Sequence, residues 1–107
     1  MSIEPDAETM AQLSAKALHV GDRSCQALGI TIEGIAPGRG TVRLRVTDIM
    51  VNGHGIAHGG YHGIAHGGYL FLLADTAFAY ARNTYGTATV AHGAQVTFLR
   101  PAAVGVQ

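Results

Sequence analysis

Hydrophobic and polar positions recur with a helical period at the start of this chain. Within residues 5–20, Met10, Leu13, Ala17 and Leu18 fall on one side of a helix. Acidic residues precede this pattern and a glycine directly follows it, as is favourable at the two ends of a helix. We therefore predict an amphipathic helix over residues 5–20.

The next residues change to the two-residue period of strands. A short turn or helix at residues 23–28 leads into a weakly alternating strand over residues 30–35. Residues 37–40 read Pro-Gly-Arg-Gly and predict a turn, because glycine readily adopts positive φ. Residues 42–47 then alternate apolar and polar side chains, which is the clearest strand signal in the chain. The two strands are expected to pair as a hairpin.

The second half of the chain predicts one more helix and one more strand. Residues 68–83 are apolar on nearly every side, as in a helix that a sheet encloses. We expect this helix to end before Gly86. Alternation returns over residues 89–98 and predicts a third long strand, which Pro101 ends.

Between the strands and this helix lies an internal repeat. Residues 54–61 read HGIAHGGY, and residues 62–69 repeat all eight letters. Solenoid repeats need at least three copies and diverge in sequence, so this pair is not typical of a solenoid. We interpret it as one local segment copied in tandem, which gives the chain two HGG triplets.

Composition restricts the class of protein. The chain has 107 residues, enough for one domain, and zero formal net charge, which disfavours a nucleic-acid partner. Charged residues make up 13%, against about 25% in average soluble proteins, so we expect surface hidden in a subunit interface. Cys25 is the single cysteine and allows no intrachain disulfide.

The same composition predicts a cytoplasmic protein without a membrane partner. The acidic N-terminus is unlike a signal peptide. The most apolar stretch, residues 67–81, is too short to span a bilayer and contains Asp75.

Asp75 is the strongest candidate for a catalytic residue. It is the only charged side chain between Asp48 and Arg82, and its neighbours three and four positions away along the predicted helix are apolar. A carboxylate in such surroundings needs hydrogen bonds, a partner or an opening to solvent. Asp75 is therefore either a satisfied structural residue or a general base or nucleophile with a tuned pKa.

The start of the same helix, His66-Gly67-Gly68, is a second candidate. Free backbone N–H groups at a helix N-terminus favour negative charge and can stabilise an oxyanion, although such glycines also serve simple turns. His66 and Asp75 are separated by roughly 13 Å along a helix. If both act on one carbonyl, one of them must come from a neighbouring subunit.

Histidines suggest a third hypothesis, a metal site. His54, His58, His62 and His66 recur at intervals of four, which would align them on a helix. Residues 54–68 contain six glycines, however, and each disfavours a helix. The spacing also follows directly from the tandem copy. We therefore predict no metal.

Several of these segments together resemble a known family. They are Asn52-Gly53-His54, residues 66–81 (HGGYLFLLADTAFAYA), residues 27–30 (ALGI) and residues 97–101 (TFLRP). The pattern resembles the hotdog-fold acyl-CoA thioesterases, with the thioesterases of phenylacetic acid degradation as the nearest group. The resemblance implies an α+β fold in which an antiparallel sheet wraps a central helix, with residues 1–107 as a single domain. It also implies a homo-oligomer, a dimer or a tetramer, that hydrolyses acyl-CoA such as phenylacetyl-CoA.

The resemblance also implies roles for individual residues. Asp75 matches the helix carboxylate that activates water or attacks the thioester carbonyl. His66, Gly67 and Gly68 match the triplet whose backbone N–H groups polarise that carbonyl from the opposite subunit. Asn52 matches the asparagine that holds the water or the thioester. No metal and no cofactor are implied, since coenzyme A is part of the substrate.

Two departures from the family pattern leave alternatives open. His58-Gly59-Gly60 keeps the family spacing to Asn52, whereas the second triplet keeps the spacing to Asp75. Either eight residues loop out, or Asn52 is displaced from the helix start. The family also continues with further strands after the segment at residues 97–101. We therefore expect an incomplete or rearranged sheet with unpaired edges, and the alternative function is an inactive, refolded or segment-swapped oligomer.

Overall fold

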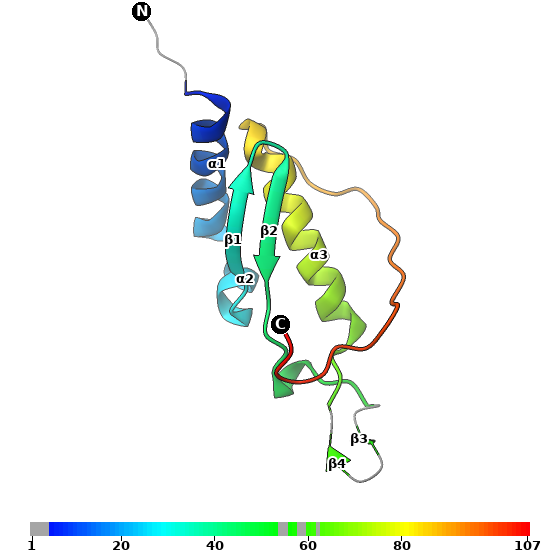
Figure 1. Cartoon of the computed structure of the whole chain (residues 1–107). Coiled ribbons are helices and arrows are strands. Elements are labelled where there is room, and N and C mark those ends of the chain that lie inside the picture. Colours follow the sequence, from blue (N-terminus) through cyan, green and yellow to red (C-terminus); the bar gives the residue numbers. More distant parts are fainter. Residues whose placement is uncertain (1–4, 54–55, 58–59, 62) are drawn as a thin grey trace, which may run out of the picture.

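The computed structural model describes residues 5–53, 56–57, 60–61 and 63–107, and it confirms the α+β class. Its elements in chain order are α1 (Ala7–Gly21), α2 (Arg23–Leu28), β1 (Thr31–Ala36), β2 (Arg39–Arg43), the 3-10 helix η1 (Asp48–Met50), β3 (Ile56–Ala57), β4 (Gly60–Tyr61), α3 (Gly67–Arg82) and the 3-10 helix η2 (Asn83–Tyr85). The β1–β2 hairpin lies between α1 and α3 (Figure 1).

Helix α1 forms where the sequence predicts it, but its buried side differs. The carboxylate of Asp6 caps the helix, because its Oδ1 accepts a hydrogen bond of 2.7 Å from the Thr9 N–H. Ala11 is fully buried, whereas Leu13 is 52% exposed and Ala17 is also exposed. The expected apolar side containing Leu13 and Ala17 was therefore wrong. The helix contacts η2 and β1 through longer side chains as well: the Met10 Sδ lies against Gly86, just after η2, and the Gln12 Nε2 donates to the Ile35 carbonyl of β1 at 2.9 Å.

Asp22 joins three helices at the end of α1. Its Oδ1 accepts from the Cys25 N–H at 3.1 Å and so caps α2, while its Oδ2 accepts from the Tyr80 hydroxyl of α3 at 3.2 Å. Gly29 ends α2 at φ 73°, a conformation that glycine adopts without strain. Tyr80 is 1% exposed, so its hydroxyl depends on this carboxylate for a partner.

The predicted hairpin is confirmed. β1 and β2 pair antiparallel, with Ile35 opposite Gly40 and an irregularity in register between Ile32 and Gly34. The alternation predicted for residues 42–47 also holds. Leu44 and Val46 are buried although β2 itself ends at Arg43.

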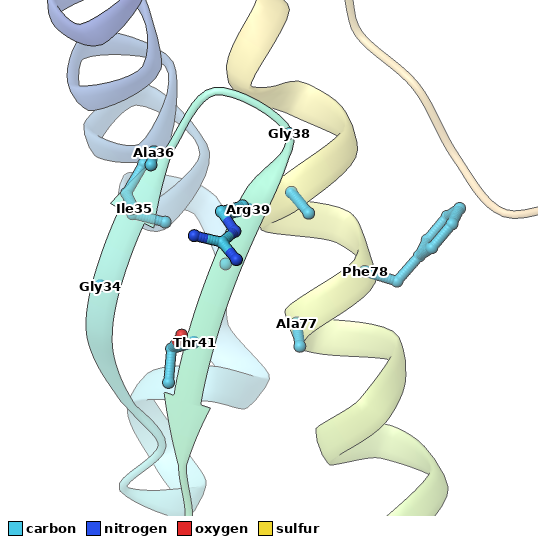
Figure 2. Close-up of a pocket in the computed structure, with 10 residues that line it drawn as sticks. Gly34, Ile35, Ala36, Gly38, Arg39, Thr41, Ala77 and Phe78 are labelled. Atoms are coloured by element: carbon cyan, nitrogen blue, oxygen red, sulfur yellow. The ribbon is translucent and has the colours of Figure 1, made fainter.

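Helix α3 packs closely on β2 through a glycine. A Cβ at Gly40 would lie 3.0 Å from the Ala77 carbonyl oxygen and 3.1 Å from the Ala81 nitrogen, so the strand backbone approaches the helix backbone directly. Beside this contact, the hairpin and α3 line an open groove of about 700 Å³. Figure 2 shows that Phe78 points away from the hairpin there.

The hydrophobic core lies near the N-terminal end of α3. Its buried members are Cys25, Ile30, Leu44, Val46, Met50 and Ala65, with side chains of α3 packed against them. The predicted helix over residues 68–83 is thus confirmed. However, the hairpin covers only one side of α3, so the expectation of an enclosed helix was wrong for a single copy of the chain: Phe78 is 44% exposed.

The third strand predicted over residues 89–98 was also wrong. None of these residues is assigned to a strand, and Val90 is 89% exposed. After η2 the chain runs outside α3 as an extended stretch and returns to the N-terminal end of that helix (Figure 1). Alternating side chains suit a strand, but a strand also needs a neighbour to satisfy its backbone groups, and no described strand lies beside this stretch.

A single copy of the chain leaves much apolar surface uncovered. Its radius of gyration is 16.6 Å, whereas a compact domain of this length has about 13 Å. Val20, Ile49 and Leu99 are each more than 70% exposed. Within the described part of the chain, no helix is both long enough and apolar enough to cross a membrane.

The buried hydroxyl of Tyr80 gives a stability prediction. Burial and the neighbouring Asp22 carboxylate raise the pKa of Tyr80 well above its ordinary value of 10.0. The unfolded state therefore loses this proton first, so the free energy of unfolding should fall as pH rises above 10. Y80F should lower that free energy by about 1.5 kcal/mol at pH 7 and weaken its alkaline decline. Urea unfolding from pH 7 to 11 measures both effects. Y85F is the control, because Tyr85 is 59% exposed, and an equal loss in Y85F would contradict the assignment.

Candidate functional site

The N-terminal end of α3 is built from the second HGG triplet. Gly67 is the first helical residue and His66 is the N-cap. The His66 Nδ1 accepts a hydrogen bond of 3.2 Å from the Gly68 N–H. Among the described residues, the Gly67 N–H has no hydrogen-bond partner. It is therefore the amide that can donate to an incoming oxygen at the positive end of the helix dipole.

Three stretches of chain meet at this helix start. The His66 N–H donates to the Met50 carbonyl at 2.7 Å, and the Asn52 N–H donates to the Ile64 carbonyl at 3.0 Å. From the far end of the chain, the Ala102 carbonyl accepts a 2.7 Å hydrogen bond from the Ala65 N–H. These backbone bonds hold Asn52 beside the helix although the tandem copy separates the two in sequence.

The structure places Asn52 beside the helix start, which bears on the two alternatives for the repeat. β3 and β4 pair with each other as a small separate hairpin, which extends away from the rest of the molecule in Figure 1. Val51 pairs with Ala65 at the base of this hairpin. Asn52 is therefore not displaced from the helix start. Of the first triplet, His58 and Gly59 lie outside the described residues.

A groove of about 780 Å³ opens at the same place, within the range usual for small-molecule sites. It brings together four of the five predicted site residues, namely Asn52, His66, Gly67 and Gly68. Its other walls are mainly apolar and include Ile64, Leu70, Phe71, Val96, Phe98 and Leu99. Arg100 adds a charged side chain to the lining. The groove thus combines a backbone donor, a polar amide side chain and a large apolar wall.

Asp75 lies apart from this groove. It lines a smaller recess of about 140 Å³ together with Phe71, Phe78 and the stretch at residues 91–96. Its side chain is exposed, so the opening to solvent is how the chain accommodates a carboxylate among apolar neighbours. Phe71 and Val96 line both hollows and form the wall between them. Since Asp75 is nine positions after His66, their backbones are roughly 13 Å apart along the helix.

The metal hypothesis concerns residues that are mostly not described. His54, His58 and His62 lie outside the described residues, and His66 uses Nδ1 as a helix cap. Within the ranges that the structure describes, no three His, Cys, Asp or Glu side chains lie together in a way that would hold a metal ion.

Sequence reasoning missed two residues that line the groove. In the sequence, Phe98 lies on one side of a predicted strand and, with Arg100, in the family-like segment at residues 97–101. Nothing in their local pattern indicates a groove. They reach it because residues 101–104 return to pair with the segment before α3, where Val104 N–H donates to the Gly63 carbonyl at 2.8 Å.

Comparisons with known proteins find similarity to thioesterases. The thioesterase superfamily matches residues 62–106. The acyl-coenzyme A thioesterase PaaI of Escherichia coli K12 is 44% identical over 92 residues, which cover 86% of this chain and 60% of that protein. A putative esterase of Deinococcus radiodurans is 38% identical over 80 residues, covering 75% of this chain and 49% of that protein. The chain thus spans about half to three fifths of the curated relatives it matches.

A solved structure gives the same match in three dimensions. The structure of the E. coli PaaI protein from the phenylacetic acid degradation operon superposes with a TM-score of 0.83 at 41% identity. The superposition covers 94% of this chain and 67% of that one.

The cap at the start of α3 gives a second prediction. H66A removes the acceptor of the Gly68 N–H and should lower the free energy of unfolding by about 1 kcal/mol. H66N keeps a side-chain acceptor at the N-cap and should retain most of the stability. Urea unfolding followed by circular dichroism compares the two variants with the unchanged chain. Equal losses in H66A and H66N would contradict the capping role.

Proposed function

This chain belongs to the hotdog-fold thioesterases of the thioesterase superfamily, and on that premise we propose that it hydrolyses acyl-CoA thioesters. The proposed substrate is phenylacetyl-CoA or a related aryl-acyl-CoA. The observation that carries the proposal is the joint placement of the Gly67 amide, Asn52 and an apolar wall in one groove. Arg100 in the same lining suits a substrate that carries phosphates.

The helix start supplies the electrophilic half of the proposed reaction. The thioester carbonyl oxygen accepts a hydrogen bond from the Gly67 N–H, and the dipole of α3 favours the negative charge that develops on this oxygen. The side chain of Asn52 holds the attacking water or the thioester. His66 contributes by fixing the first turn, since its imidazole occupies the Gly68 N–H.

Asp75 supplies the nucleophilic half. Its carboxylate takes a proton from water as the water oxygen bonds to the carbonyl carbon, or it attacks that carbon itself. In both cases cleavage of the carbon–sulfur bond expels the coenzyme A thiolate, which takes up a proton. When water attacks, this step releases the carboxylic acid directly; when Asp75 attacks, it leaves an anhydride between the acyl group and Asp75, which a water molecule then hydrolyses to the acid and the free carboxylate. Asp75 is open to solvent, which gives water access to the carboxylate. The reaction as proposed uses no metal and no cofactor.

The two halves are proposed to come from different subunits. One copy places Asp75 roughly 13 Å from its own helix start, too far for both to reach one carbonyl. The exposed apolar side chains along residues 90–99 offer surface that a second copy can cover. The functional unit is therefore a homo-oligomer, a dimer or a tetramer. A cytoplasmic location and the absence of nucleic-acid or membrane partners stay predictions.

Removal of the carboxylate tests the chemistry. D75N keeps the size of the side chain but cannot accept the proton or attack the carbonyl, so kcat with phenylacetyl-CoA should fall by about 100-fold or more. Release of the free thiol measures turnover. D48N is the control, since Asp48 is exposed in η1 and lines neither hollow. Equal rates in the unchanged chain and D75N, or no turnover in either, would contradict the proposal and favour the inactive oligomer.

Subunit mixing tests the shared site. If Asp75 and Asn52 of one site come from different copies, a mixed dimer of D75N and N52A contains one intact site and one doubly altered site. Half of randomly assorted dimers are mixed, so the mixture should regain roughly a quarter of the unaltered activity. The subunits are mixed in mild denaturant, refolded and assayed, with each variant alone as the control. A mixture no more active than its components would place both residues of a site on one copy.

A further inference from the structure

Phe98 lies directly against the first residue of α3. A Cβ built on Gly67 would lie 2.9 Å from the Phe98 Cζ, 3.1 Å from Cε2 and 3.3 Å from Cε1. The outer end of the ring therefore rests on a backbone position that has no side chain. The ring closes one side of the helix start, next to the Gly67 N–H.

The residues that follow Phe98 are held in place by backbone hydrogen bonds. Residues 101–104 are held by the backbone bonds from Ala65 to Ala102 and from Val104 to Gly63. On the preceding side, Val96 lines the wall that the groove shares with the recess of Asp75. The ring is 52% exposed, so one surface contacts the helix start and the rest faces open groove. An aromatic ring that is supported on one side and free on the other can pack against a ligand.

We propose that Phe98 is the specificity-determining residue for the acyl group and selects planar aromatic groups over saturated ones of similar size. This inference rests on the proposed function, because it takes the Gly67 amide as the position of the thioester carbonyl. A carbonyl at that amide places its acyl substituent beside the Phe98 ring. Paired aromatic rings attract each other in offset or edge-to-face geometry beyond simple burial of area. A saturated ring is thicker and lacks this attraction.

Binding of two substrate analogues that cannot be hydrolysed tests the inference separately from turnover. The probes are S-(2-oxo-3-phenylpropyl)-CoA and its cyclohexyl counterpart, in which a methylene separates the carbonyl from sulfur. We expect the unchanged chain to bind the phenyl analogue about 5- to 10-fold more tightly, as measured by titration calorimetry. F98A should reduce this preference to less than about 2-fold, and F98L, which keeps most of the volume, should also lose most of it.

I49A is the control, because Ile49 is 76% exposed in η1 and lines neither hollow, and its preference should equal that of the unchanged chain. Circular dichroism verifies that each variant is folded. A preference that persists in F98A and F98L, or an unchanged chain that binds neither analogue, would overturn the inference. A preference that depends on Phe98 without any turnover would instead contradict the proposed hydrolysis and leave the binding role of Phe98 intact. Turnover that depends on Asp75, together with a binding preference that does not depend on Phe98, would overturn the inference about Phe98 and leave the proposed hydrolysis intact.

Discussion

The backbone hydrogen bonds at the start of α3 are the constraint on which the site depends. Met50, Ala65 and Ala102 come from three separate stretches of chain, and their peptide groups hold the residues around His66 in one place. Buried peptide groups without partners are costly, so these bonds define where each stretch must lie. The groove exists because the stretches meet there. The positive end of a long helix is thereby presented to a mainly apolar hollow.

The repeat shows how local this constraint is. The segment before α3 pairs with Val51 and with Ala103, so Asn52 stays beside the helix start although the β3–β4 hairpin lies between them in sequence. The cost of a longer loop grows only slowly with its length. One HGG triplet therefore caps the helix, while Gly60 of the other belongs to β4.

Small residues determine the close contacts in this molecule. Gly40 lets β2 approach the backbone of α3, and Gly67 lets the Phe98 ring rest on the first helical turn. A side chain at either position would push these elements apart by a few tenths of an ångström or more. By contrast with these close contacts, Phe78 and Asp75 project from the side of α3 that the hairpin leaves uncovered. A second copy of the chain is the proposed cover for that surface.

The sequence by itself determined both long helices, the first hairpin and the candidate residues Asn52, His66 and Asp75. Helical and two-residue periods, caps and turn glycines are local signals, and the family-like motif is a contiguous string. Only the tertiary structure decided that residues 89–98 form no strand, that Asp75 lies outside the groove and that Phe98 belongs to it. Strand formation and groove lining depend on which distant segments lie side by side. The periodicity within one segment does not encode which other segments will lie next to it.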